Sequence, residues 1–244
     1  MLFLKKIIKK YKYIKKKFYL KIFKLLFQNK EGIEFGGPTN LVEKPHYEFQ
    51  LYNFLVLDGA NLSEENYFQG NLEKEYKYGN KIGKQFNADV TKITDLERIN
   101  KKYDFIFTSH IIEHIANPIN TLIIWKNILN KHGYLISIVP DYRFSFDRKR
   151  KLTKISHILE DFNNNIQEDD VTHISEQLDL HDWSLGGMKN FKQLAANNFS
   201  TRVVHHHTFI KSTLKKLLKV SGYKTVFSFK LDDLNIVNVA KLKK

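Results

Sequence analysis

Residues 103–118, which read YDFIFTSHIIEHIANP, decide the fold of this chain. The apolar run at 103–108 predicts a buried strand that stops at a polar turn carrying two histidines and a glutamate. A helix over 118–130 and a second apolar strand over 134–139, ending at Pro140, are expected to follow. In an open α/β sheet, ligands bind outside the carboxyl ends of the strands. We therefore expect a ligand near Ser109, His110, Glu113 and His114.

This stretch resembles the class I S-adenosylmethionine-dependent methyltransferases, in the branch whose fourth strand ends in a His-x-x-Glu-His signature. The resemblance covers residues 31–140 well and the C-terminal part more loosely. It implies an α/β fold with a Rossmann-like, seven-stranded, mostly parallel sheet, helices on both faces, and an insertion after strand five. It also implies S-adenosylmethionine as methyl donor and S-adenosylhomocysteine as product. A helix over 208–220 and strands over 225–230 and 234–240 match the antiparallel C-terminal hairpin of that fold.

Composition excludes several classes of protein. The 244 residues contain no cysteine, which rules out a disulfide framework and a cysteine-based metal site. No run approaches the roughly 18 apolar residues that a membrane-spanning helix needs. The N-terminus lacks the uninterrupted apolar core of a signal peptide. These features predict a cytoplasmic protein.

The net charge of +14 is concentrated in one segment. Residues 1–30 contain eleven lysines and no acid, whereas the rest of the chain holds 29 basic and 26 acidic groups. We divide the chain into a basic amphipathic helix at 1–29 and a methyltransferase domain at 30–244. Within that domain, residues 141–207 form an insertion over the acceptor site.

The basic helix carries an apolar stripe, which suits an anionic membrane surface such as the inner face of the membrane. Each lysine near such a surface contributes about 1 kcal/mol. Alternatively, the stripe packs on the domain or on a second subunit. The stripe consists of Leu4, Ile7, Ile8, Tyr11, Ile14, Phe18, Ile22, Leu25 and Leu26.

The cofactor site implied by the resemblance begins at a strand over 32–35. There Glu34, Gly36 and Gly37 match an acid followed by a glycine turn, although the usual third glycine is missing. Glycine lets the backbone approach a ligand closely. A second strand over 53–57 is expected to end at Asp58, which would bind the ribose hydroxyls. The polar segment 63–84 should replace or distort the next helix.

A third strand, over 86–90, would bring Asp89 to the adenine amino group. The implied cofactor set is completed by residues next to these strand ends, which are Val90, Ser109, His110 and Glu113.

The insertion is polar, which suits a hydrophilic acceptor. Arg143 could clamp an anionic group, or it could form a structural ion pair with Asp147. The candidates for binding the acceptor are Tyr142, Arg143, Asp147, Asp182 and His205.

Histidine is the expected general base for an alcohol acceptor. The candidates are His110, His181 and His206, and at most two of the three histidines at 205–207 can share one face of an extended segment. A divalent metal bound by His181, Asp182 and one of these three has no spacing signature behind it, so the metal content is unknown.

Three functions remain open. The first is O-methylation of a small polar acceptor, namely a sugar, a nucleotide-sugar or a phosphorylated precursor in surface polysaccharide (capsule) biosynthesis. The second is methylation of RNA, which the lysines would bind. It ranks lower because the strand ends Thr108-Ser109-His110 and lacks an aromatic-proline motif. The third is a scaffold that has lost the cofactor.

Overall fold

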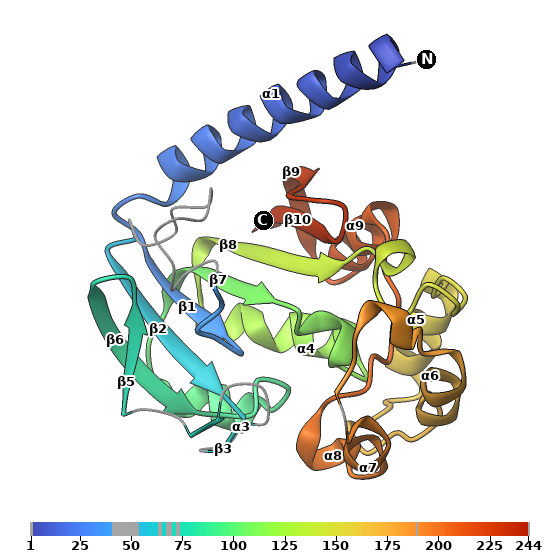
Figure 1. Cartoon of the computed structure of the whole chain (residues 1–244). Helices are drawn as coiled ribbons and strands as arrows, with labels where there is room; N and C mark the ends of the chain where they lie inside the picture. The colour runs from blue at the N-terminus through green and yellow to red at the C-terminus, as the bar shows by residue number, and fades with distance from the viewer. Residues whose placement is uncertain are drawn as a thin grey trace.

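An eight-stranded sheet lies at the centre of the computed structural model, which describes residues 2–40, 54–62, 65–66, 70–71, 74–188 and 190–243 (Figure 1). The strand order is β5-β6-β2-β1-β7-β8-β10-β9. The five strands from β6 to β8 are parallel, whereas β5, β10 and β9 each run antiparallel to their neighbour toward the centre of the sheet. The strands of this sheet are β1 Glu31–Phe35, β2 Val56–Asn61, β5 Glu75–Tyr78, β6 Lys81–Asn87, β7 Tyr103–Ser109, β8 Leu129–Pro140, β9 Tyr223–Lys230 and β10 Asn235–Leu242.

The predicted α/β fold with a mostly parallel sheet and an antiparallel C-terminal hairpin is confirmed, but the predicted number of strands is too small. The additional strand, β5, comes from the polar segment 63–84, and it pairs with β6 in a hairpin. Side chains alternate along β5: Tyr76 and Tyr78 are buried, whereas Glu75 and Lys77 are exposed. The described part of this segment also contains the short pair β3 Glu65–Asn66 and β4 Gly70–Asn71. Residues 41–53, where the second strand was expected to begin, lie outside the described residues.

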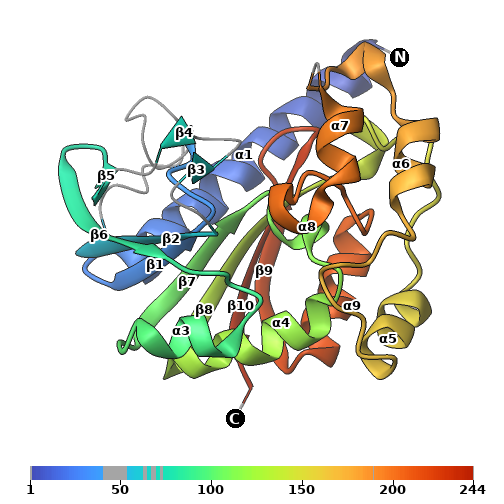
Figure 2. The ribbon, with the colours of Figure 1, turned by 90° about the horizontal axis from the view of Figure 1, so that it is seen from below.

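Helices cover both faces of the sheet (Figure 2). On one face lie α3 Ile93–Arg98, α4 Pro118–Ile124 and α9 Lys211–Val220, and across the other lies α1 Leu2–Phe27. The insertion after β8 folds into short helices beside the carboxyl edge of the sheet (Figure 1). They are α5 Ile155–Asn163, α6 Ile174–Leu180, α7 Phe191–Ala196 and α8 Asn198–Thr201. Single 3₁₀ turns are η2 Ile112–His114, η3 Trp125–Ile128, η4 Tyr142–Phe144 and η5 Trp183–Leu185.

Two apolar clusters hold these layers together, one on each face of the sheet. Phe35 packs edge-on against Trp125 on the face covered by α3 and α4, with ring centroids 4.9 Å apart. On the other face, Phe27 contacts Phe105 at 5.3 Å. Burial of aromatic side chains of this size contributes about 2–3 kcal/mol each. The central strands are therefore apolar on both faces, which is typical of parallel strands.

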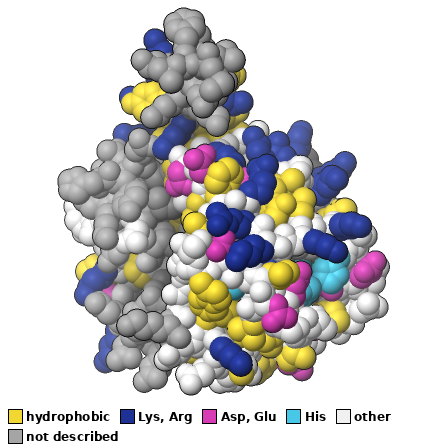
Figure 3. Space-filling model, turned by 45° about the vertical axis from the view of Figure 1, so that its right-hand side comes forward, with side chains coloured by type: hydrophobic (Ala, Val, Ile, Leu, Met, Phe, Trp, Pro, Cys, Tyr) yellow, Lys and Arg dark blue, Asp and Glu magenta, His cyan; other side chains and the backbone are white. Residues whose placement is uncertain are grey.

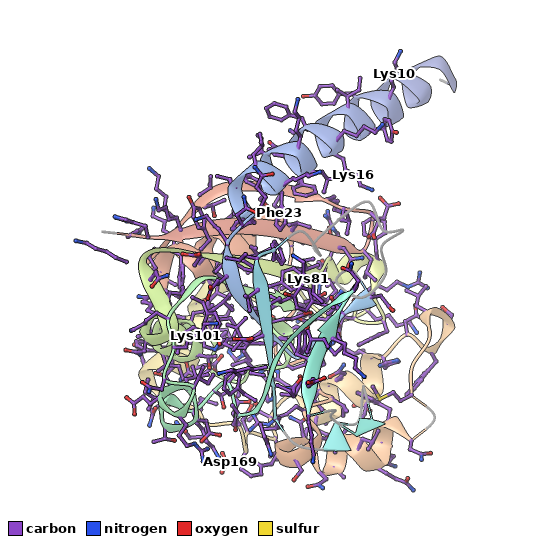
Figure 4. All side chains as sticks on the ribbon, turned by 90° about the vertical axis from the view of Figure 1, so that its left-hand side faces the viewer. Lys10, Lys16, Phe23, Lys81, Lys101 and Asp169 are labelled. Atoms are coloured by element: carbon purple, nitrogen blue, oxygen red, sulfur yellow. The ribbon has the colours of Figure 1, made fainter. Side chains whose placement is uncertain are left out.

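The predicted N-terminal helix forms, and Ile22 and Leu26 of the predicted stripe pack against the domain together with side chains outside the stripe. Tyr19 stacks on Phe227 and Phe229, with centroids 5.4 and 5.2 Å away, and Phe23 and Phe27 are buried on the sheet. From the predicted stripe, Tyr11, Ile14, Phe18 and Leu25 are instead exposed. Figure 4 shows Phe23 near the sheet, and Lys10 and Lys16 on the part of the helix that projects beyond it. The helix therefore has apolar side chains on two faces, and the described residues of the domain cover one of them.

Several predicted element boundaries are wrong. The strand predicted over 86–90 is β6, which covers Lys81–Asn87 and ends before Asp89. Strand β2 does not end at Asp58 but continues to Asn61. The helix predicted over 118–130 gives way to a 3₁₀ turn at Trp125, and β8 already begins at Leu129. Within the insertion, α5 ends at Asn163, because Asn165 adopts a left-handed φ of 51° that a continuing helix does not allow.

Candidate active site

A cavity of about 1260 Å³ lies at the carboxyl edge of the sheet, between the strand ends and the insertion. This is where the fold is expected to place a ligand. Among the predicted site residues, those that line it are Gly36, Asp89, Val90, Ser109, His110, His181 and His205. Those that do not line it are Glu34, Gly37, Asp58, Glu113, Tyr142, Arg143, Asp147, Asp182 and His206.

The glycine turn after β1 opens the backbone to the cavity. Gly36 has a φ of +74°, and a Cβ atom there would lie 2.2 Å from Ile111 Cδ1. Asn61, at the end of β2, donates from Nδ2 to the Gly37 carbonyl over 2.8 Å. Its Oδ1 atom is buried and has no hydrogen-bond partner among the described residues. The turn and Asn61 together present an open backbone and an unused acceptor to a ligand.

Asp58 does not reach this cavity, so the sequence prediction needs correction. Its carboxylate accepts from the Tyr103 hydroxyl at 2.7 Å, from Lys101 Nζ at 3.1 Å and from the Lys84 amide at 2.8 Å. These bonds tie β2 to β6 and β7. Because β2 runs three residues further, the polar residue at the strand end is Asn61.

Glu34 supports the glycine turn from behind. It is fully buried, accepts a hydrogen bond from the Tyr76 hydroxyl, and accepts another from the Thr39 amide at 3.2 Å. Burial raises the pKa of Glu34 to about 7, and the hydrogen bonds offset only part of this effect. A Cβ atom at Gly37 would lie 2.3 Å from the Glu34 carboxyl carbon, so the turn packs directly on this group.

Asp89 lines the cavity and is held from both sides. Its Oδ1 accepts from the Thr91 hydroxyl at 2.6 Å, and its Oδ2 lies 3.2 Å from Arg202 Nη2. Arg202 also bonds to Glu168, and both residues line the cavity. Sequence reasoning missed Asn61, Glu168 and Arg202, because no local pattern marks an arginine that meets an acid 113 residues away.

The turn after β7 brings His110, Glu113 and His114 together. His110 has a φ of 55°, its Nε2 lies 2.7 Å from Asn235 Oδ1, and its Nδ1 lies 3.4 Å from Glu113 Oε1. Burial alone would lower the pKa of His110, but the Glu113 carboxylate outweighs it and the net shift is upward. Glu113 is fully buried behind the cavity wall.

His114 lines the cavity as a neutral ring. Burial, and then repulsion from His205, lowers the pKa of His114 to about 3. Its Nδ1 lies 3.2 Å from the Val204 carbonyl, and its ring meets that of His205 edge-on at 4.4 Å.

His205 and Asp147 form a hydrogen-bonded pair at the insertion side of the cavity. Nδ1 of His205 donates to Asp147 Oδ2 over 2.6 Å, and Arg150 Nη1 donates to the other carboxylate oxygen over 3.0 Å. Burial would raise the pKa of Asp147, but His205 and Arg150 outweigh it, so this group stays a carboxylate. With the ring proton held at Nδ1, Nε2 of His205 is the nitrogen with a free lone pair.

The two other predicted bases are placed differently. His181 lines the cavity within an aromatic wall, 4.5 Å from Phe146 and 4.0 Å from Trp183 between ring centroids. Its Nε2 lies 3.0 Å from the Gly186 carbonyl, so this nitrogen carries the proton. His206 is buried away from the cavity, and its Nε2 accepts from Asn198 Nδ2 at 3.2 Å. The structure therefore does not bring His206 to the site.

The predicted anion clamp does not face the cavity either. Arg143 bonds to both oxygens of Asp141, over 2.8 and 2.7 Å, and the alternative pair of Arg143 with Asp147 does not form. Asp182 begins η5 and pairs with Arg148 and Lys149. Among the described residues, no metal-capable group contains His181 or Asp182. The insertion thus uses most of its charges to hold itself together.

Comparisons with known proteins place this arrangement in a family. A family model described as a methyltransferase domain matches residues 7–227. No curated protein matches the chain.

Solved structures with a similar fold include three methyltransferases. The CurJ carbon methyltransferase is 11% identical, with a TM-score of 0.44, and the match covers 89% of this chain and 49% of that one. The Burkholderia thailandensis 1,6-didemethyltoxoflavin-N1-methyltransferase is 10% identical, with a TM-score of 0.47 and coverages of 89% and 72%. The plantazolicin methyltransferase BpumL is 13% identical, with a TM-score of 0.47 and coverages of 96% and 84%. The chain thus spans about half the length of the first of these proteins. Because the family model matches most of the sequence, the chain belongs to the methyltransferase domain family.

Proposed function

We propose that this enzyme methylates a hydroxyl group of a small polar acceptor and that His205 is the general base. The observation that carries the proposal is the His205–Asp147 pair at the cavity, with its 2.6 Å hydrogen bond on the side away from the free Nε2. A carboxylate that fixes the tautomer of a histidine and stabilises its protonated form is the usual arrangement of a histidine base. Methylation of a hydroxyl requires such a base, because the hydroxyl must lose its proton at or near the transition state.

The proposed methyl donor is S-adenosylmethionine, and the residues at the strand ends suit its binding. Gly36 lines the cavity at a position where Ile111 leaves no space for a side chain, and the buried Oδ1 of Asn61 is an acceptor suited to a ribose hydroxyl. Asp89 offers a carboxylate to the adenine amino group. Ser109, His110 and Val90 complete the wall, and Glu34 holds the turn from behind.

The cofactor supplies an activated methyl group on a sulfonium, so the protein mainly aligns the acceptor and removes its proton. His205 takes the hydroxyl proton at Nε2. Asp147 and Arg150 keep the ring oriented, and the Asp147 carboxylate stabilises the imidazolium that forms. His114, neutral because of its lowered pKa, adds no competing positive charge beside His205.

The acceptor side of the cavity suits a sugar ring. Phe144, Phe146 and His181 line this side with aromatic rings, and Ser145 adds a polar group. Sugar rings offer apolar C–H faces and polar edges, and this mixture is complementary to both. We therefore place the acceptor among sugars, nucleotide-sugars and phosphorylated precursors of surface polysaccharides, the class implied by the sequence resemblance.

The proposal is tested by methyl transfer from radiolabelled cofactor to a panel of nucleotide-sugars, sugar phosphates and RNA. We expect label in one of the carbohydrate acceptors, and we expect the Asn61→Ala variant to bind S-adenosylhomocysteine about 10-fold more weakly in calorimetry. Label in RNA alone, falling steeply with salt, would support the nucleic-acid alternative. A folded protein that binds no S-adenosylhomocysteine would support the scaffold alternative.

We also propose that the projecting half of α1 binds an anionic lipid surface at the inner face of the membrane. Tyr11, Ile14 and Phe18 are exposed there at 64%, 57% and 60%, and lysines surround them. Lysine and arginine side chains, dark blue in Figure 3, are also frequent on the adjoining face of the domain. No helix in the described part of the chain is both long and apolar enough to cross a bilayer. An exposed apolar stripe flanked by lysines is instead typical of a helix that lies in the interface.

Sedimentation with vesicles of phosphatidylglycerol and phosphatidylcholine tests the lipid proposal. The Lys10→Gln, Lys15→Gln, Lys21→Gln triple variant removes about 3 kcal/mol of attraction and should bind about 100-fold more weakly. The matched control replaces three exposed lysines of α9, at 215, 216 and 219, and should bind as the wild type does. If the two triple variants bind equally well, or if the wild type only dimerises through α1, the lipid proposal is wrong.

A further inference from the structure

A second cluster of histidines and acids lies in the insertion, outside the cavity. His157 and Asp161 project from α5 one turn apart, and His207 lies on the segment that leads into α9. His173 precedes the first residue of α6. None of these side chains lines the cavity, and the proposed methyl transfer uses none of them. Figure 3 shows histidine side chains, in cyan, reaching the surface beside acidic ones.

Three donor atoms in this cluster converge on one point. Asp161 Oδ2 lies 3.6 Å from His157 Nε2 and 3.8 Å from His207 Nε2, and all three atoms lie within 4.8 Å of one another. His173 Nε2 is a further 3.1 Å from His157 Nε2. Bonds of 2.0–2.1 Å to a tetrahedral metal place neighbouring donors about 3.3 Å apart. The two spacings to Asp161 Oδ2 are close to that value.

The carboxylate of this cluster has a buried oxygen without a hydrogen-bond partner among the described residues. This oxygen is Asp161 Oδ2, and the side chain that carries it is only 12% exposed. A buried polar group without a partner calls for an explanation, and a bound ion is one.

We propose that His157, Asp161 and His207 bind one divalent transition-metal ion of the zinc class, with His173 as an additional donor. Two imidazoles and a carboxylate suit such an ion better than magnesium or calcium, which prefer oxygen ligands throughout. His207 now donates from Nε2 to the Ala116 carbonyl over 3.2 Å. On binding, its proton moves to Nδ1, which is buried and has no partner within the described chain.

A neighbouring group with similar side chains is not the metal site. Asp170, His173 and His206 also lie within 4.8 Å of one another. However, the Val204 amide donates to Asn198 Oδ1 over 2.9 Å, which fixes the orientation of that amide group. Asn198 must then donate to Nε2 of His206, so the ring carries its proton on Nδ1, toward Asp170. His206 therefore cannot offer Nδ1 to a metal in its neutral form.

The ion would act as a clamp between α5 and the segment that carries His205. His207 is two residues beyond the proposed base, and α5 contacts α4 and α9 on the sheet. Fixing His207 to α5 would fix the backbone at His205 as well. The ion touches no reacting atom in this arrangement, so its role is structural and the site stands independently of the proposed acceptor.

The test is a titration of chelator-treated full-length protein with zinc chloride by calorimetry, and with cobalt chloride by visible absorption. We expect one ion per chain. With cobalt we expect the intense visible absorption of an ion that has four or five ligands. His157→Ala and Asp161→Asn should each weaken binding by more than the roughly 10–100-fold that follows loss of an outer-shell contact. His157 is 39% exposed, so its removal should leave the metal-free fold intact. The matched control is His132→Ala, which removes an exposed histidine of β8.

Binding of S-adenosylhomocysteine, measured on every variant, separates this inference from the methyltransferase activity. Retained cofactor binding with lost metal binding supports the site. The proposal is overturned if the wild type binds no metal, if both cluster variants bind it as the wild type does, or if the His132→Ala control loses it as well.

Discussion

Replacing His205 by alanine should stop methyl transfer at its proton-removal step without loss of cofactor binding. A positioned general base contributes about 10²- to 10⁴-fold to the rate, which corresponds to about 3–5 kcal/mol in the barrier. Asp147→Asn should cost less, because it leaves the base in place and removes only the charge that faces the imidazolium. At an effective dielectric constant of about 20, that charge pair is worth about 4 kcal/mol at 4 Å. Arg150, 3.0 Å from Asp147, already neutralises part of this charge. We therefore expect a loss of about 10- to 100-fold for Asp147→Asn.

The assay is the initial rate of methyl transfer at saturating cofactor, with and without added imidazole. The His205→Ala variant leaves a hole of imidazole size beside Asp147, so free imidazole should restore part of kcat in this variant and in no other. Calorimetry with S-adenosylhomocysteine confirms that the cofactor site is intact. The reasoning is refuted if His205→Ala keeps kcat within about 3-fold of the wild type, or if it loses kcat but imidazole restores nothing while His110→Ala is rescued.

Three further changes have expected outcomes. Gly36→Ala forces a side chain into a φ of +74° and to 2.2 Å from Ile111 Cδ1, so thermal unfolding should show a loss of about 1–2 kcal/mol and calorimetry a weaker affinity for S-adenosylhomocysteine. Asp58→Ala leaves the Tyr103 hydroxyl and the Lys84 amide without their acceptor, while Lys101 keeps Glu31 at 3.2 Å, so the fold should lose about 1–3 kcal/mol in urea titrations. The folded fraction should still bind S-adenosylhomocysteine, and selective loss of binding would restore Asp58 to the ribose role. His114 has a pKa of about 3 when folded against 6.5 when unfolded, so the unfolded chain binds more protons between these values and the free energy of unfolding falls as the pH drops through this window. His114→Gln should make that fall shallower when unfolding is compared at pH 7 and pH 4.5, and an unchanged slope would contradict the buried, neutral state of His114.

The sequence was sufficient to predict the central strands, because their apolar runs and the abrupt polar turn after Thr108 are typical of buried strands in an α/β chain. The end of β2 could not be found in the same way. Asp58-Gly59 looks like a turn, but in the structure Gly59 lies inside the strand, where a Cβ atom would be 1.9 Å from the ring of Tyr76. That glycine makes room for a tyrosine of β5, a strand whose position no local pattern indicates.

The candidate base illustrates the same limit. The three consecutive histidines at 205–207 indicate a functional site, but the role of each depends on partners far away in the sequence. His205 meets Asp147, 58 residues before it, while His206 meets Asn198 and His207 meets the Ala116 carbonyl. Each ring turns to a different neighbour, so the sequence could mark the segment without identifying which histidine enters the cavity.

The aromatic anchoring of α1 has a mechanical consequence. The helix is 26 residues long, or about 39 Å at 1.5 Å per residue, and it is continuous from Leu2 to Phe27. Because Tyr19, Phe23 and Phe27 are packed on the sheet, the projecting half cannot swivel about a hinge of its own. The helix therefore moves with the domain as one rigid element. A partner bound to the projecting part of α1 would also fix the distance and the orientation of the cavity relative to that partner.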